Sequence, residues 1–128
     1  MIVDETVPGM WARHQWMGDA VRAAMGALRL ELFAECPGNV LTAVKIPDGV
    51  DGEKLVKEMR DDLGVTMAGG QGSMKGKIFR LAHLGYMDRF DMTTGLAAVE
   101  IALKRQGFGV KLGVGAAAAE EILWQDPK

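Results

Sequence analysis

The chain has 128 residues, of which 48% are hydrophobic and 25% are charged, and this composition excludes a disordered chain and suits one globular domain. The formal net charge of −2 gives no electrostatic basis for binding nucleic acid, and no apolar run approaches the ~18 residues of a membrane span. We therefore expect a single domain over residues 1–128, with neither a membrane nor a nucleic acid as partner. The single cysteine, Cys36, excludes an internal disulfide and fits a cytoplasmic location.

The first half of the chain predicts one long helix followed by two strands. Residues 8–28 are expected to be helical, because Pro8 suits a first helical turn and apolar residues recur at helical spacing. Residues 30–33 and 40–46 are rich in strand-forming side chains, and Pro47 begins a strong breaker after the second segment.

The second half predicts two further strands among three helices. Asp51 is a suitable N-cap and Gly64 a suitable stop for the first of these helices, and Asp91 and Gly107 have the same roles in the next. The remaining predicted elements are strands at residues 65–68 and 78–82 and a short helix at residues 114–124.

Helices and strands are mixed without strict alternation, which predicts an α+β fold: a small, mainly antiparallel sheet of three or four strands packed against helices. The order of elements in residues 40–111 also permits a βαββαβ arrangement, as in ferredoxin-like domains. Both arrangements remain open from the sequence.

A glycine-rich loop, residues 69–76, leads directly into the strand at residues 78–82. A P-loop needs glycine five residues before its Gly-Lys pair, but Gln71 occupies that position, and Ile78 stands where serine or threonine is required. The loop also precedes a strand, whereas phosphate cradles precede a helix. We therefore expect a flexible connection with positive φ angles rather than a nucleotide site.

Arg80 lies between apolar neighbours in the predicted strand. A buried or half-buried cation is costly unless a counter-charge meets it, and a guanidinium suits a carboxylate of the protein as well as one of a ligand. Two interpretations follow: an internal ion pair, or a clamp for a small anionic ligand.

The two histidines and the single cysteine are too scattered to predict a metal site. His83, just after the arginine strand, is expected either to form structural hydrogen bonds or to contact a ligand. His14 lies between Arg13 and Gln15 on the first helix and is expected at the surface or at a rim.

Several segments together resemble the class V pyridoxal-phosphate aminotransferases, in particular the alanine–glyoxylate and serine–pyruvate group. The Gly-Lys-Ile-Phe-Arg run at residues 76–80, with its flanks, is the most specific of these segments. Helical and extended segments from about Met10 to Glu121 follow the order of the small C-terminal domain of those enzymes, which implies the same α+β fold.

The resemblance implies a role for the arginine. Arg80 occupies the position of the residue that grips the α-carboxylate of the amino or keto acid substrate, with His83, Tyr86 and the loop at residues 70–76 as neighbours. Pyridoxal 5'-phosphate is implied for the complete enzyme. Lys75 superficially resembles the cofactor-holding lysine, but it lies among glycines and near Lys77, so we expect it to be solvated.

The large domain that holds the cofactor in those enzymes has no counterpart in this sequence. We therefore expect no cofactor, no catalytic residue and no transaminase activity on the chain alone. Its expected partner is the missing large domain or a separate subunit, and self-association could cover an exposed apolar face. The alternatives are a free-standing ferredoxin-like module that binds a small carboxylate effector, and a structural subunit that completes the active site of another polypeptide.

Overall fold

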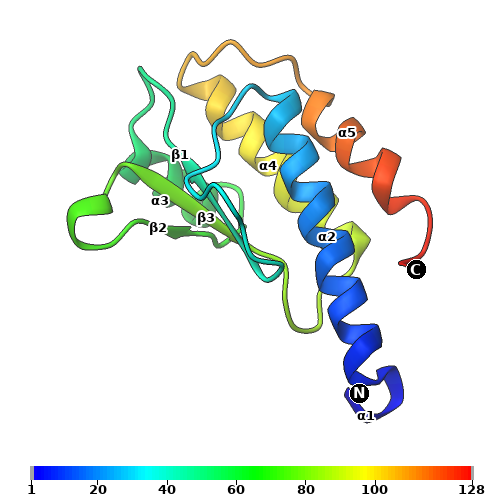
Figure 1. Cartoon of the computed structure of the whole chain (residues 1–128). Coiled ribbons are helices and arrows are strands. Elements are labelled where there is room, and N and C mark those ends of the chain that lie inside the picture. The colour runs from blue at the N-terminus through cyan, green and yellow to red at the C-terminus, as the bar shows by residue number, and fades with distance from the viewer. Residues whose placement is uncertain (1, 128) are drawn as a thin grey trace.

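A small sheet and a group of packed helices make up residues 2–127, the part of the chain that the computed structural model describes (Figure 1). This arrangement confirms the predicted α+β class. The elements in chain order are α1 (Ile2–Glu5), α2 (Val7–Ala27), β1 (Leu41–Lys45), α3 (Gly52–Asp61), β2 (Ala68–Gly69), the 3₁₀ turn η1 (Gly72–Met74), β3 (Ile78–Ala82), α4 (Arg89–Arg105) and α5 (Val114–Leu123).

Strand β3 is the centre of the sheet, whose order is β1-β3-β2, and it runs antiparallel to both neighbours. Helix α3 connects β1 to β2, so β3 is inserted between two strands that a helical crossover joins. This is a split βαβ unit. The prediction of a small, mainly antiparallel sheet is confirmed.

One face of the sheet is buried against the helices. Thr42 and Val44 of β1 and Phe79 of β3 are completely buried, because alternate side chains of paired strands point to the same side. Helix α2 packs along α5 and also contacts α4 and β1. Other members of this core are Met17, Val21, Met25, Leu55, Met59, Leu96, Val99 and Leu103.

The predicted N-cap of α3 is confirmed and that of α4 is wrong by one turn. Asp51 caps α3, and its side chain accepts a hydrogen bond from the Lys54 amide at 3.0 Å. In α4 the N-cap is Asp88, whereas Asp91 is the third helical residue and closes a capping box with it. From the sequence, either of two aspartates three residues apart can be the N-cap. The conformation of the preceding loop determines which of them is.

Two predicted strands are shorter in the structure. Residues 30–33 form only an isolated bridge, between Leu32 and Val44, because α2 and its C-terminal turn take up the chain as far as Leu30. The strand expected at residues 65–68 is reduced to Ala68–Gly69, since the preceding segment is held by Val65 donating to the Met59 carbonyl at the end of α3.

The ferredoxin-like alternative requires a fourth strand after α4. In the described chain no strand follows α4: residues 106–113 form turns and an extended link, and α5 then packs against α2. That alternative is therefore wrong for this chain. The helix at residues 114–124 was predicted correctly, to within one residue of its observed end.

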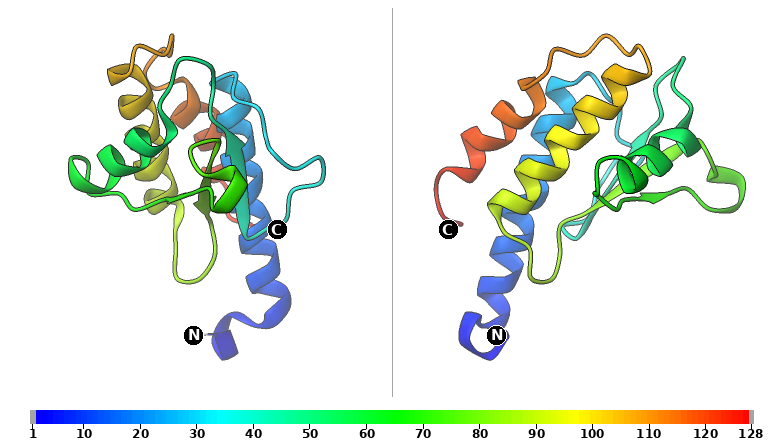
Figure 2. Two further views of the ribbon diagram at one scale, coloured as in Figure 1. Left: turned by 90° about the vertical axis from the view of Figure 1, so that its left-hand side faces the viewer. Right: turned by 180° about the vertical axis from the view of Figure 1, so that it is seen from behind.

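Figure 2 shows that α1 and the first turns of α2 extend beyond the rest of the domain in both views. Trp11 on this projecting part is 64% exposed. Among the helices of residues 2–127, none combines the length and the hydropathy that crossing a membrane requires.

Candidate functional site

Strand β3 carries Arg80 on the sheet face opposite to the one that the helices bury. Arg80 pairs with Ala43 of β1 and with Ala68 of β2, and side chains at paired positions point to the same side. Both flanking side chains are single methyl groups, so they do not shield a long side chain between them. Arg80 is half-buried and Ala68 is exposed, which leaves the guanidinium accessible from outside.

The contacts of Arg80 decide between its two sequence-based interpretations. Its Nε donates to the carbonyl oxygen of Gly69 at 2.9 Å. Within residues 2–127 no carboxylate forms an ion pair with it, so the interpretation as an internal ion pair is wrong. A half-buried guanidinium without a counter-charge is suited to bind an anionic ligand.

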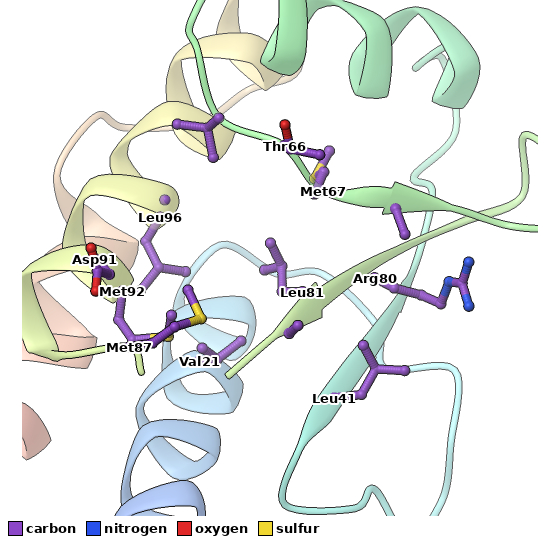
Figure 3. A pocket seen from close by; sticks show the side chains of 14 residues that line it. Val21, Leu41, Thr66, Met67, Arg80, Leu81, Met87, Asp91, Met92 and Leu96 are labelled. Atoms are coloured by element: carbon purple, nitrogen blue, oxygen red, sulfur yellow. The ribbon is translucent and has the colours of Figure 1, made fainter. Parts of the chain in front are cut away.

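An apolar hollow of about 430 Å³ opens beside the base of Arg80. Met67 and Leu81 line it, together with Met92 and other residues of α4. In Figure 3 the guanidinium points away from these apolar side chains. The hollow therefore adjoins the alkyl part of Arg80, and the charged end lies outside it.

The glycine-rich loop forms the 3₁₀ turn η1. Gly72 and Gly76 have φ angles of +55° and +74°, which confirms the expected need for positive φ. The side chain of Lys75 is 72% exposed and forms an ion pair with Glu53, with Nζ and Oε1 3.2 Å apart. The expectation that Lys75 is solvated is therefore confirmed.

His83 turns into the core, where it is completely buried. Its Nε2 lies 2.9 Å from Thr42 Oγ1, and its Nδ1 lies 2.9 Å from the carbonyl oxygen of Asn39. A carbonyl can only accept, so Nδ1 carries the proton and the Thr42 hydroxyl donates to Nε2. Both ring nitrogens are thus engaged within the protein. The contacts match the structural interpretation of His83 and leave no nitrogen for a ligand.

Protonation of His83 should destabilise the fold. Burial lowers the pKa of His83 below its usual value of 6.5, and burial lowers the pKa of His14 in the same direction. The unfolded chain therefore binds more protons just below pH 6.5, so the stability contribution is complete above that pH and is lost as the pH falls. We expect the urea concentration at the unfolding midpoint to decrease as the pH is lowered from about 7.5 to about 5.5. His83→Gln should reduce this dependence on pH. If the urea midpoint of His83→Gln depended on pH as strongly as that of the unmodified chain, the assignment of this effect to His83 would be wrong.

His14 is buried, only 7% exposed, so the expected surface position is wrong, whereas the expected rim position agrees with its place in the lining of a hollow beside the loop after β3. Its Nε2 accepts a hydrogen bond from the Gly85 amide at 3.3 Å. The neighbouring Arg13 donates through Nη1 to the carbonyl oxygens of Gly85 and Met87, at 2.8 and 3.3 Å. Helix α2 thus holds the loop between β3 and α4.

Tyr86 lies at the tip of that loop and is 85% exposed. It borders a second, larger hollow between the loop and the start of α2, whereas Arg80 borders the apolar hollow described above. The two hollows share Met87 and Asp91 as lining residues. The structure therefore places Tyr86 beside the region of Arg80 without bringing the two side chains into one site.

The lysines test whether this chain could hold pyridoxal phosphate covalently. A Schiff-base lysine needs a desolvated environment that lowers its pKa. Every lysine in the described part of the chain is exposed to solvent. The lysines of residues 2–127 therefore do not fit a covalently held pyridoxal phosphate.

Known proteins and solved structures resemble almost the whole length of this chain. No family model matches it. It is 37% identical, over 96% of its length, to the small subunit of a soluble hydrogenase from Synechococcus sp.. It is 33% identical, over 94% of its length, to the serine–glyoxylate aminotransferase of Hyphomicrobium methylovorum. The crystal structure of ureidoglycine–glyoxylate aminotransferase from Bacillus subtilis matches 97% of the chain with a TM-score of 0.92 and 29% identity.

The α+β fold of this chain thus also occurs as about one third of a larger aminotransferase structure. Besides the hydrogenase subunit, the homologues and structural neighbours of this chain include class V aminotransferases, which use pyridoxal phosphate, and the resemblance seen in the sequence is confirmed. The chain spans about one third of the relatives that it matches: 33%, 31% and 33% of the three proteins above.

Sequence reasoning missed the groups that hold the site together. The Gly69 carbonyl that engages Arg80 is a backbone atom, which no residue pattern identifies. Gly18 of α2 also went unnoticed, although a Cβ there would lie 2.9 Å from Cε1 of His83. A glycine inside an otherwise regular helix was the available signal for this close approach.

Proposed function

We propose that this chain acts as the small domain of a pyridoxal-phosphate-dependent aminotransferase of the alanine–glyoxylate or serine–pyruvate type. In this proposal Arg80 binds the carboxylate of a small amino or keto acid substrate. The observation that carries the proposal is the absence of an ion pair for Arg80 within residues 2–127, on a face of the sheet that the helices leave uncovered.

A guanidinium presents planar, parallel N–H groups that match the two oxygens of a carboxylate. Two such bonds fix the carboxylate in both position and direction. The α-carbon of the substrate is then held in one orientation, and such orientation can lower a barrier by several kcal/mol. The electron-withdrawing chemistry would be supplied by the cofactor on the rest of the enzyme.

We assign the other two candidate residues different roles. His83 acts indirectly, because its bonds to Thr42 and to the Asn39 carbonyl fix the end of β3 next to the start of β1. Tyr86 remains a candidate substrate contact, since its side chain is exposed on a loop that α2 anchors. The group that Tyr86 contacts would belong to the ligand or to the remainder of the enzyme.

The partner that we propose is the large domain, on the same polypeptide or on a separate subunit. The chain spans about one third of its relatives, so the remaining two thirds are available to carry the cofactor. The open face of the sheet, with Leu41 37% exposed, is the side on which that domain would close over Arg80. We also propose a cytoplasmic location, which the exposed Cys36 suits.

A chimeric enzyme tests this proposal directly. In the Bacillus subtilis ureidoglycine–glyoxylate aminotransferase, the third that matches this chain is replaced by this chain. We expect transamination of glyoxylate by alanine, serine, aspartate or ureidoglycine at a rate at least about tenfold above that of the truncated enzyme without any replacement. A chimera that folds and binds the cofactor but transaminates none of these donors would contradict the proposal.

A further inference from the structure

The hydrogen bond of Arg80 to Gly69 determines which side of the guanidinium remains available. A guanidinium has two edges that can grip a carboxylate: the edge with Nε and one Nη, and the end with both Nη atoms. Nε already donates to the Gly69 carbonyl oxygen at 2.9 Å. The end with Nη1 and Nη2 is therefore the edge presented to a ligand.

The Gly69 carbonyl is itself held by the turn that follows it. The Gly70 amide donates to the Ile78 carbonyl oxygen at 3.1 Å, which continues the pairing of β2 with β3. The chain then folds back so tightly that a Cβ on Gly70 would lie 2.0 Å from the carbonyl oxygen of Met74. A residue other than glycine would force this backbone apart.

The far side of the loop is fixed as well. A Cβ on Gly52, in the first turn of α3, would lie 2.5 Å from the carbonyl oxygen of Gly76. The loop is thus packed against α3 at one end and closed on itself at the other. Because neither contact leaves space, the direction of the Gly69 carbonyl is determined by backbone geometry.

We infer that the Gly70 turn is a positioning element for Arg80: it aims the Gly69 carbonyl at Nε and so directs the two terminal nitrogens at a ligand carboxylate. This inference rests on the proposed function of Arg80. It adds that Gly70, which touches no ligand, controls how well a carboxylate is held. A lysine at position 80 could not reproduce the arrangement, because its donors lie on a single nitrogen and cannot bond the Gly69 carbonyl while presenting a planar two-nitrogen fork to a carboxylate.

The hydrogen bond from Arg80 Nε to the Gly69 carbonyl can be tested by NMR in the 128-residue chain. We expect the Nε–H of Arg80 to exchange with water at least about tenfold more slowly than that of the exposed Arg29. Gly70→Ala should abolish this difference. Gly115→Ala is the matched control, because its Cβ would also be crowded, 2.7 Å from Glu100 Oε1, but on α5; it should leave the exchange of Arg80 slow.

Slow exchange that persists in Gly70→Ala would overturn the inference. If Gly70→Ala does not fold, the wild-type chain still tests the inference. The Gly70 amide and the Arg80 Nε–H should then show the same dependence of exchange on urea, because one opening of the loop exposes both. Different dependences would overturn the inference.

Kinetics in the chimera separate this inference from the proposed function. Single-turnover rates are compared for alanine and for ethylamine, which lacks the carboxylate. Gly70→Ala should slow the alanine reaction by about tenfold or more and leave the ethylamine reaction unchanged. If Arg80→Ala slows alanine but Gly70→Ala does not, the positioning role alone is wrong. If neither variant affects alanine selectively, the proposed function of Arg80 is wrong.

Discussion

Replacing Arg80 with alanine in the chimeric enzyme is expected to lower kcat/KM for α-amino acid donors by about 10²- to 10⁴-fold. A charge-assisted hydrogen bond contributes about 1.5–3 kcal/mol, and a carboxylate held at two points loses two of them. About 1.4 kcal/mol corresponds to a tenfold change, which gives the expected range. The measurement is steady-state kinetics with alanine, serine and aspartate as donors.

The same substitution should leave the stability of the isolated chain almost unchanged. The side chain of Arg80 makes one hydrogen bond, to Gly69, and no ion pair within the described residues. The loss of that bond is offset by removing a half-buried charge that has no counter-ion, so the free energy of unfolding should change by less than about 1 kcal/mol. Arg80→Lys retains the charge without the planar fork and should give an intermediate kcat/KM. A large loss of stability in Arg80→Ala, with unchanged kinetics, would show that the arginine is structural.

Replacing Glu100 with alanine is expected to reduce the free energy of unfolding by about 3–4 kcal/mol. Glu100 lies on α4 and is only 2% exposed. Its Oε1 accepts from the Ala116 amide at 2.9 Å, and its Oε2 accepts from the Gly113 amide. Removing the carboxylate leaves two backbone donors at the start of α5 without their acceptor, and also removes a negative charge from the positive end of that helix.

Chemical denaturation followed by circular dichroism measures this effect. Glu120→Ala is the control, since Glu120 is an exposed residue of α5 and should change stability by less than about 0.5 kcal/mol. Glu100→Gln keeps one acceptor oxygen and should lie between the two. Equal stabilities for Glu100→Ala and Glu120→Ala would show that α5 does not depend on the buried carboxylate.

Local signals in the sequence were sufficient for most helices and for the central strand. Asp51 caps α3 as its side chain and the following residues predicted, and Ile78–Ala82 is a strand as its apolar run indicated. The predicted class of fold and the family resemblance followed from these elements and from the Gly-Lys-Ile-Phe-Arg segment. Signals of this kind act over a few residues, so they are readable without knowledge of the neighbours in space.

The sequence-based predictions were wrong where the structure depends on contacts with distant residues. Residues 30–33 have strand propensity, but the end of α2 leaves room for only one bridge to β1. His14 appeared to belong to a polar helix face, yet the loop after β3 folds over it and the Gly85 amide donates to its ring. Both outcomes depend on contacts between residues far apart in the chain, which strand propensity and helical periodicity do not encode.

Residue types and their order were enough to show that a lone arginine lies in an apolar strand and that a carboxylate must be able to reach it. The packing of the folded chain was needed to show that no acid of residues 2–127 does so, because the register of the sheet places alanines on both sides of Arg80. It also decided that His83 is turned inward against Thr42, since burial beside α2 leaves both ring nitrogens dependent on protein partners. The charge of a residue can be read from its own position in the sequence, whereas the partner of that charge depends on how the strands and helices pack.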